Sequence, residues 1–102
     1  MIKNKGITVI DFWSQHCEPC ERVNQFLPEL RKTFPDIALF KIDISNPNNS
    51  QRVKEIIAQN NVKIVPRLTI YKDGNVVDNI RAKGAISKRR IINAIRKHHE
   101  QF

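Results

Sequence analysis

The stretch that decides the fold is residues 7–20, ITVIDFWSQHCEPC. Its first half is apolar and rich in β-branched residues, a pattern typical of a strand buried on both faces. After it, apolar residues recur at the spacing of an amphipathic helix, at Val23, Phe26, Leu27, Leu30 and Phe34. The sequence therefore predicts a strand that leads directly into a helix, with a Cys-x-x-Cys motif at the junction.

Cys17 and Cys20 are the only cysteines of the chain. At a helix N-terminus, unpaired backbone N–H groups and the helix dipole favour an anion, so we expect Cys17 to be a thiolate more readily than an ordinary cysteine. A thiol three residues on can close a disulfide with it. Zinc would need about two further ligands, for which His16, His98 and His99 are the candidates. We expect a redox pair, without metal or other cofactor.

The composition predicts one small domain, residues 1–102, with 40% hydrophobic residues. No apolar run approaches the roughly 18 residues of a membrane span, and residues 1–6 contain no cleavage site, so we expect a cytoplasmic protein with no membrane contact. We also expect a monomer. The net charge of +8 favours acidic partners. We expect a solvated basic face rather than a nucleic-acid site, because no aromatic residue is interleaved with the densest basic cluster: Lys83, Lys88, Arg89, Arg90, Arg96 and Lys97.

The rest of the chain alternates strand and helix patterns. Residues 37–44 predict a second strand, and residues 50–60 a helix capped by Ser50 or Asn49. Residues 68–71 and 76–81 predict an antiparallel hairpin with an Asp-Gly turn, and Ser87 is expected to cap a last helix that reaches His99. The order β-α-β-α-β-β-α predicts an α/β fold, a mixed four-stranded sheet with helices on both faces.

With Cys-x-x-Cys on the first strand-to-helix crossing, the chain resembles the thioredoxin family. The resemblance rests on four motifs in the family's order: IDFW at 10–13, CEPC at 17–20, VP at 65–66 before a strand ending in KDG at 72–74, and GAISK at 84–88. It implies a thioredoxin fold. Because residues 1–6 leave little room before the first strand, the family's first strand and helix are expected to be largely absent. Residues 37–44 would then form an exposed sheet edge, protected by Lys41 and Asp43.

The resemblance implies roles for the central residues. Cys17 would be the nucleophile, and Cys20 would resolve the mixed disulfide. Asp11 lies in an apolar strand, so we expect its pKa to be raised. By resemblance it would help to deprotonate Cys20, with Lys41 as its partner.

Substrate contacts follow from the same comparison. The resemblance implies a cis peptide bond before Pro66 and a substrate hydrogen bond to the backbone of Val65. Trp13 would form a lid beside the cysteines, and Arg67 and Gly84 would line the same site.

The residues around the cysteines differ from the family's usual ones. Between the cysteines, this chain has Glu18-Pro19 where the family usually has Gly-Pro, and His16 replaces a Trp. A carboxylate at Glu18 opposes a thiolate at Cys17, whereas a guanidinium at Arg67 would support it. We therefore expect His16, Glu18, Pro19 and Arg67 to tune the redox potential.

The resemblance implies an enzyme that reduces protein disulfides and is recharged by a thioredoxin-reductase-like electron donor. Two alternatives remain open. Cys-Glu-Pro-Cys also resembles the extracytoplasmic reductases that serve cytochrome c maturation. Alternatively, the basic domain is a binding module for an acidic partner or for nucleic acid.

Overall fold

A computed structural model describes residues 6–81 and 86–99 of the chain. The elements are β1 (Ile7–Trp13), α1 (Glu18–Thr33), β2 (Ala38–Asp43), α2 (Gln51–Gln59), β3 (Arg67–Lys72), β4 (Asn75–Arg81) and α3 (Lys88–His99). The predicted order of strands and helices is confirmed.

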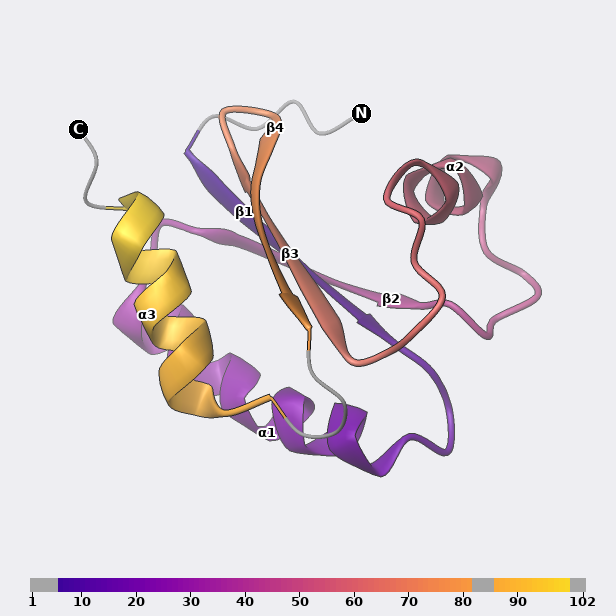
Figure 1. Cartoon of the computed structure of the whole chain (residues 1–102), viewed down its shortest axis with the longest axis horizontal. Helices are drawn as coiled ribbons and strands as arrows, with labels where there is room; N and C mark the ends of the chain where they lie inside the picture. The colour runs from indigo at the N-terminus through magenta and orange to yellow at the C-terminus, as the bar shows by residue number, and fades with distance from the viewer. Residues whose placement is uncertain (1–5, 82–85, 100–102) are drawn as a thin grey trace.

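The described strands form one four-stranded sheet in the order β2-β1-β3-β4. β1 pairs in parallel with β2 and antiparallel with β3, which pairs antiparallel with β4. Helices α1 and α3 cover one face of the sheet and α2 covers the other (Figure 1). We call these the α1/α3 face and the α2 face. β1, whose residues are mostly apolar, is thus an inner strand of the sheet, as its composition predicts.

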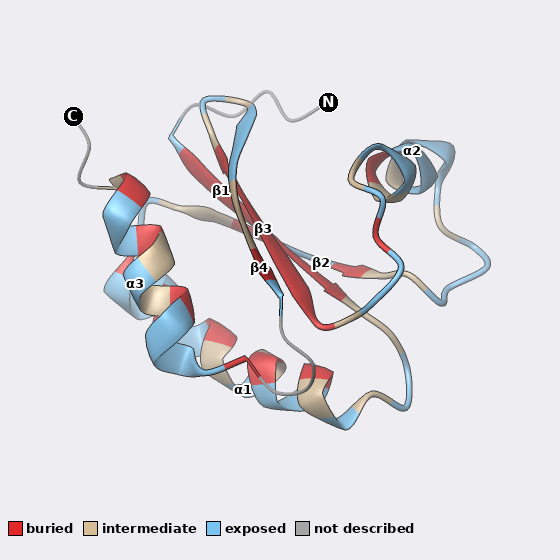
Figure 2. Ribbon diagram, viewed as in Figure 1, coloured by how far each residue is buried: buried red, intermediate tan, exposed pale blue. Residues whose placement is uncertain are grey.

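The core has a layer on each face of the sheet, and the buried colour follows the strands and the inner sides of the helices (Figure 2). The α1/α3 layer includes Ile7, Val9, Val23, Leu27, Leu30, Leu68, Ile70, Ile91 and Ile95. The α2 layer includes Ile10, Phe12, Ile42, Ile56, Val62 and Tyr71. Because side chains alternate along a strand, Asp11 lies on the α1/α3 face with Val9.

Each helix begins at a side chain that accepts a backbone N–H. Ser50 Oγ accepts from the Val53 N–H at 3.2 Å, and Ser87 Oγ accepts from the Arg90 N–H at 3.1 Å. Both satisfy donors that the first helical turn leaves unpaired, which confirms the predicted caps. Helix α1 is capped by Cys17 itself.

The outer edge of β2 is capped by side chains. The Ile44 N–H donates to the Trp13 carbonyl, so the backbone groups of alternate residues, among them Leu39 and Asp43, point away from β1. Arg31 Nη2 donates to the Leu39 carbonyl at 3.3 Å, and Asn49 Nδ2 donates to the Asp43 carbonyl at 2.8 Å. These bonds occupy acceptors to which another strand could pair.

The C-terminal end of α3 is held by histidines. His98 Nε2 lies 3.3 Å from Asp78 Oδ2, and His99 Nε2 lies 2.9 Å from Asp36 Oδ2. The Lys72 ammonium also donates to the His98 carbonyl at 3.0 Å. Figure 1 shows this end of α3 far from the start of α1, so the two histidines do not join Cys17 in a zinc site. Within residues 6–81 and 86–99, no cluster of His, Cys, Asp or Glu could hold a metal ion.

The predicted basic cluster lies on α3, except for Lys83, which is outside the described residues. Lys88 forms an ion pair with Glu29 at 2.9 Å. In the described part of the chain, no helix has the length and apolar character needed to cross a membrane.

Candidate active site

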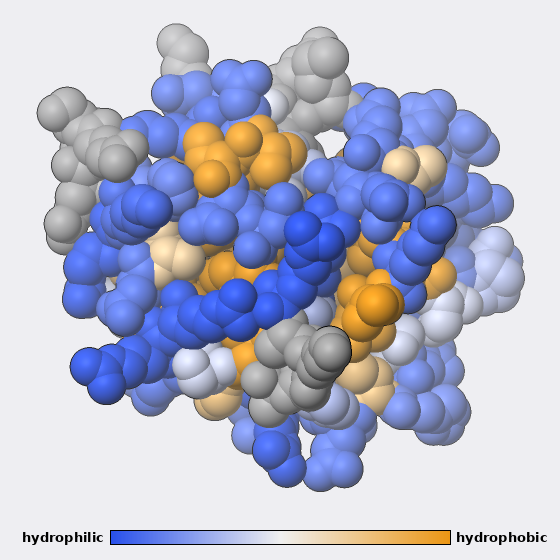
Figure 3. Space-filling model, in the orientation of Figure 1, coloured by the Kyte–Doolittle hydropathy of each residue, from blue (hydrophilic) through white to orange (hydrophobic). Residues whose placement is uncertain are grey.

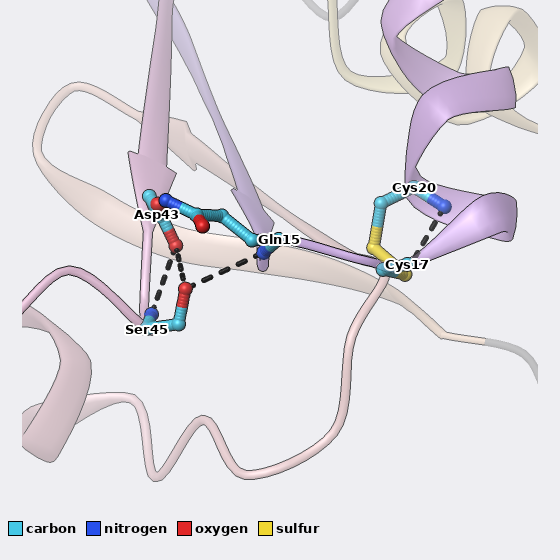
Figure 4. The surroundings of a disulfide bond; sticks show 5 residues. All are labelled: Gln15, Cys17, Cys20, Asp43 and Ser45. Carbon is cyan, nitrogen blue, oxygen red and sulfur yellow. Dashed lines mark hydrogen bonds between the residues drawn. A yellow bond between two sulfur atoms is a disulfide. The ribbon is translucent and has the colours of Figure 1, made fainter.

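The two cysteines form a disulfide at the N-terminus of α1. Their Cα atoms are 5.2 Å apart, and Cys17 Sγ accepts the Cys20 N–H at 3.2 Å (Figure 4). Cys17 is partly exposed, whereas Cys20 is only 1% exposed. This difference in exposure suits a Cys17 sulfur that attacks a substrate and a buried Cys20 sulfur that attacks Cys17.

The loop between β1 and α1 is fixed to the end of β2. Gln15 donates its backbone N–H to Ser45 Oγ at 3.3 Å, and Ser45 donates both its hydroxyl and its backbone N–H to Asp43 Oδ1, at 2.6 and 2.9 Å (Figure 4). These bonds lower the pKa of Asp43. The sequence does not predict this link, because no local pattern pairs residues 30 positions apart.

Asp11 is a buried carboxyl group on the α1/α3 face. It is 0% exposed, and neither carboxylate oxygen has a hydrogen-bond partner. Burial raises the pKa of Asp11 from 3.8 to about 7, although the positive charge of Lys41 opposes the shift. Asp11 therefore exchanges a proton near neutral pH, where a general acid or base is most effective.

Lys41 and Trp13 flank Asp11. Lys41 is directly opposite Asp11 in the β1–β2 register. Its Nζ lies 5.3 Å from the centroid of the Trp13 ring, a cation–π contact at the end of β1. The structure thus brings together the predicted residues Asp11, Lys41 and Trp13 on the two strands that precede the cysteine loop and α2.

The loop from α2 into β3 carries a cis peptide bond between Val65 and Pro66. β3 runs antiparallel to β1, with Arg67 opposite Phe12, so this loop lies at the end of the sheet where β1 leads to Cys17. Pro66 is buried, Val65 is partly exposed and Ile64 is 73% exposed. No role was predicted for Ile64, although a large apolar residue two positions before this proline is a signal that the sequence offers.

Arg67, which was expected to support the Cys17 thiolate, lies on the α2 face of the sheet. Strand alternation places it on the α2 face with Thr69 and Tyr71, whereas α1 packs on the opposite face. Its Nη1 donates to the Asn60 carbonyl at 2.7 Å, and its Nε and Nη2 donate to Asn79 Oδ1 at 3.2 and 2.9 Å. The guanidinium is thus bound to the end of α2 and to β4, and within residues 6–81 and 86–99 it makes no contact with Cys17.

The other residues expected to tune the cysteines lie beside them. His16 is exposed and has a left-handed backbone with φ of 59°. Glu18 and Pro19 occupy the first turn of α1, where the Glu18 carboxylate pairs with Arg22 at 3.2 Å on the exposed side. Gly84 lies outside the described residues.

Comparison with known proteins agrees with this geometry. The thioredoxin family model matches residues 1–97. A thioredoxin from Chlamydia trachomatis is 33% identical over 93 residues, covering 91% of this chain and 83% of that protein. The solution structure of oxidised thioredoxin from Plasmodium falciparum superposes with a TM-score of 0.75 at 26% identity, over 95% of this chain and 85% of that one.

A more distant structure supports the fold alone. A mutant thioredoxin from Halobacterium salinarum superposes with a TM-score of 0.80 at 21% identity, covering 98% of this chain and 80% of that one. The family match and the Cys17–Cys20 disulfide point to the same chemistry. The chain therefore belongs to the thioredoxin family and is a thiol-disulfide oxidoreductase that reduces protein disulfides.

Proposed function

We propose that Cys17 attacks the disulfides of other proteins, that Cys20 completes the exchange, and that a thioredoxin-reductase-like donor returns both to thiols. The observation that carries this assignment is the disulfide at the start of α1, with its first sulfur partly exposed and its second buried. An attacking thiolate must reach a substrate sulfur, whereas a resolving thiol need only reach Cys17.

In the first step, the Cys17 thiolate attacks one sulfur of the substrate disulfide. A bond forms between Cys17 Sγ and that sulfur, and the other substrate sulfur leaves as a thiolate. The helix N-terminus favours the anionic form of Cys17. The bonds from Gln15 and Ser45 hold the preceding loop to β2, which keeps Cys17 in place.

In the second step, Cys20 loses its proton and attacks Cys17 Sγ. The Cys17–Cys20 disulfide forms and the second substrate sulfur leaves, so the substrate gains two electrons and the enzyme loses two. We assign the Cys20 proton to Asp11, whose pKa of about 7 and unpartnered oxygens suit a group that accepts and returns a proton. Burial raises the pKa of Asp11, and Lys41 opposes protonation of Asp11 and so limits that rise.

The substrate is proposed to lie along the loop before β3. Within the described residues, the backbone N–H and carbonyl of Val65 make no hydrogen bond and are available to an extended chain. Trp13 is the last residue of β1, just before the cysteine loop, and we assign it the role of limiting access to Cys17.

The remaining features agree with a monomer in a reducing compartment, which we propose to be the cytoplasm. The chain has two cysteines, both in the reactive pair. It therefore holds no structural disulfide that would need an oxidising environment. The side-chain caps on β2 oppose edge-to-edge pairing.

The test is to exchange each cysteine for serine. With dithiothreitol as electron donor, we expect the wild-type protein to reduce the interchain disulfides of insulin and Cys17→Ser to lose this activity. Cys20→Ser should accumulate disulfide-linked proteins from a cell lysate, because the first step is intact and the second is lost. Arg96→Gln, an exposed change on α3, serves as the control for expression and folding.

Two results would contradict this function. One is insulin reduction that persists in Cys17→Ser. The other is a wild-type protein without reductase activity that binds DNA in a salt-dependent manner, which would favour the nucleic-acid module instead.

A further inference from the structure

Two arginines lie opposite each other where β3 begins and β4 ends. The β3–β4 register pairs Arg67 with Arg81, and the same register pairs Thr69 with Asn79. Directly opposed residues of an antiparallel pair share a face, so both arginines lie on the α2 face. The hydrogen bonds from Arg67 and Thr69 to Asn79 Oδ1 agree with that assignment.

Among the residues that the structure describes, no carboxylate neutralises the two positive charges. The described acceptors of the Arg67 guanidinium are neutral: the Asn79 side-chain oxygen and the Asn60 carbonyl. Arg67 is 6% exposed, and burial together with the charge of Arg81 lowers its pKa. Arg81 is exposed. Within residues 6–81 and 86–99, neither arginine belongs to an ion pair.

This arrangement is unfavourable to the isolated protein. Buried charges are normally paired, and like charges directly opposite in a sheet repel each other. An anion beside Arg81 would reduce both the cost of the unpaired buried charge and the repulsion between the two arginines. Arg67, opposite Arg81, would add a second, fixed positive charge to attract that anion.

The place of the arginines indicates where such an anion would come from. Arg67 directly follows Pro66, and the loop before it carries the exposed Ile64. The start of β3 and the end of β4 lie at the same end of the sheet as the start of α1 (Figure 1). On the face seen in Figure 3, the most hydrophilic surface crosses the middle, over the lower part of β4, between apolar patches.

We propose that Arg81, supported by Arg67, binds an acidic side chain that flanks the disulfide of the substrate protein, so that this enzyme prefers substrates with Asp or Glu near the reacting cysteine. The proposal rests on the disulfide-reductase function given above. The net charge of +8 draws such substrates toward the protein from a distance, and the two arginines give that attraction a fixed position.

The test uses short peptides closed by an internal disulfide. Each carries one Glu, or Gln at the same position, moved stepwise along the residues on either side of one cysteine. Reduction is followed by chromatography at low and high salt. For at least one position we expect kcat/KM to be about two- to fivefold higher for Glu than for Gln, the size expected of a partly exposed ion pair, and to become equal in high salt.

Matched variants locate the effect. Arg81→Gln should remove most of the preference while leaving kcat/KM for the Gln peptide and the redox potential unchanged. Arg96→Gln removes the same charge from the far end of α3 and should keep the preference. Arg81→Glu should invert it toward a Lys peptide and, by pairing with Arg67, should raise the free energy of unfolding.

The outcomes separate this inference from the function on which it rests. Equal rates for all Glu and Gln peptides, or an equal loss of preference in Arg96→Gln and Arg81→Gln, would overturn the inference alone. If no peptide is reduced, the function fails. Binding of the same peptides to the Cys17→Ser protein then tests the arginines by themselves, and equal affinities for the Glu and Gln peptides would overturn their role too.

Discussion

Asp11 and Lys41 face each other across β1 and β2, but the carboxyl group of Asp11 is completely buried whereas Lys41 is exposed. The positive charge lowers the pKa of Asp11 less than burial raises it, which leaves the value at about 7. Stability and catalysis therefore depend on the same group in opposite ways, since the ionised carboxylate is costly in the core and is the form that accepts a proton.

Replacing Asp11 by Asn should stabilise the protein above neutral pH. The pKa of Asp11 is about 7 in the folded chain and near its ordinary value of 3.8 when unfolded. Below about pH 4 the carboxyl group is protonated in both states and does not lower the free energy of unfolding. Between pH 4 and 7 it ionises in the unfolded chain but stays protonated in the folded one, so the free energy of unfolding falls, and above pH 7 this loss is complete. We expect Asp11→Asn to exceed the wild type by up to roughly 4 kcal/mol at pH 8 and by little at pH 4.

Urea denaturation at both pH values measures this difference. Glu55→Gln, which alters an exposed carboxylate on α2, is the control and should follow the wild type. An Asp11→Asn protein whose stability varies with pH as steeply as the wild type would contradict the assignment of the raised pKa. The same variant should slow the attack of Cys20, seen as mixed disulfides that persist longer in stopped-flow reactions.

Lys41→Gln should raise the pKa of Asp11, because it removes the charge that opposes the effect of burial. Asp11 must be ionised to accept the Cys20 proton, so the rate of the resolving step should climb at a pH about half a unit to one unit higher than in the wild type. Lys41→Arg keeps the charge and should keep the wild-type profile. An unchanged profile in Lys41→Gln would separate Lys41 from Asp11.

Glu18→Gln should make the cysteine pair more oxidising. The Glu18 carboxylate lies next to Cys17 and disfavours its thiolate, so its removal stabilises the reduced form. Glu18 is exposed and already paired with Arg22, so we expect a rise of at most about 30 mV, the equivalent of one pKa unit. Equilibration with glutathione buffers measures the potential. Glu21→Gln, one turn further along α1, should have the smaller effect, and a lower potential in Glu18→Gln would refute the idea.

The sequence predicts strands and helices well where the apolar residues of a segment follow one pattern, that of a strand or that of a helix. Residues 7–13 are mostly apolar and rich in β-branched residues, with Asp11 as the one ionisable residue, and the residues after Cys17 change to helical spacing. The strand, the helix and the cysteines between them follow directly. The side chain of Ser50 likewise marked the start of α2. These signals are local, and tertiary packing does not reverse them.

The features that the sequence did not predict depend on contacts between distant segments. Ser45 reaches Gln15 across 30 positions, and the exposure of Ile64 depends on how the loop leaves α2. The face on which Arg67 lies could have been read from its alternation with Thr69 and Tyr71. The motif comparison instead placed Arg67 beside the cysteines, because it follows the proline there. Position next to a motif does not fix the face of a sheet.

Arg31→Ala should increase self-association, because it uncaps the Leu39 carbonyl on the outer edge of β2. That edge lies beside a groove of about 240 Å³, which Phe40, itself 48% exposed, lines together with Val53 of α2. An uncapped edge with apolar neighbours is a template for pairing with a second chain. Sedimentation velocity over a range of concentrations should show dimers in Arg31→Ala at concentrations where the wild type is a monomer. Arg22→Ala removes an exposed arginine of the same helix that contacts Glu18 rather than β2, and it should stay monomeric. If both variants associate equally, the effect belongs to the lost charge and not to the strand edge.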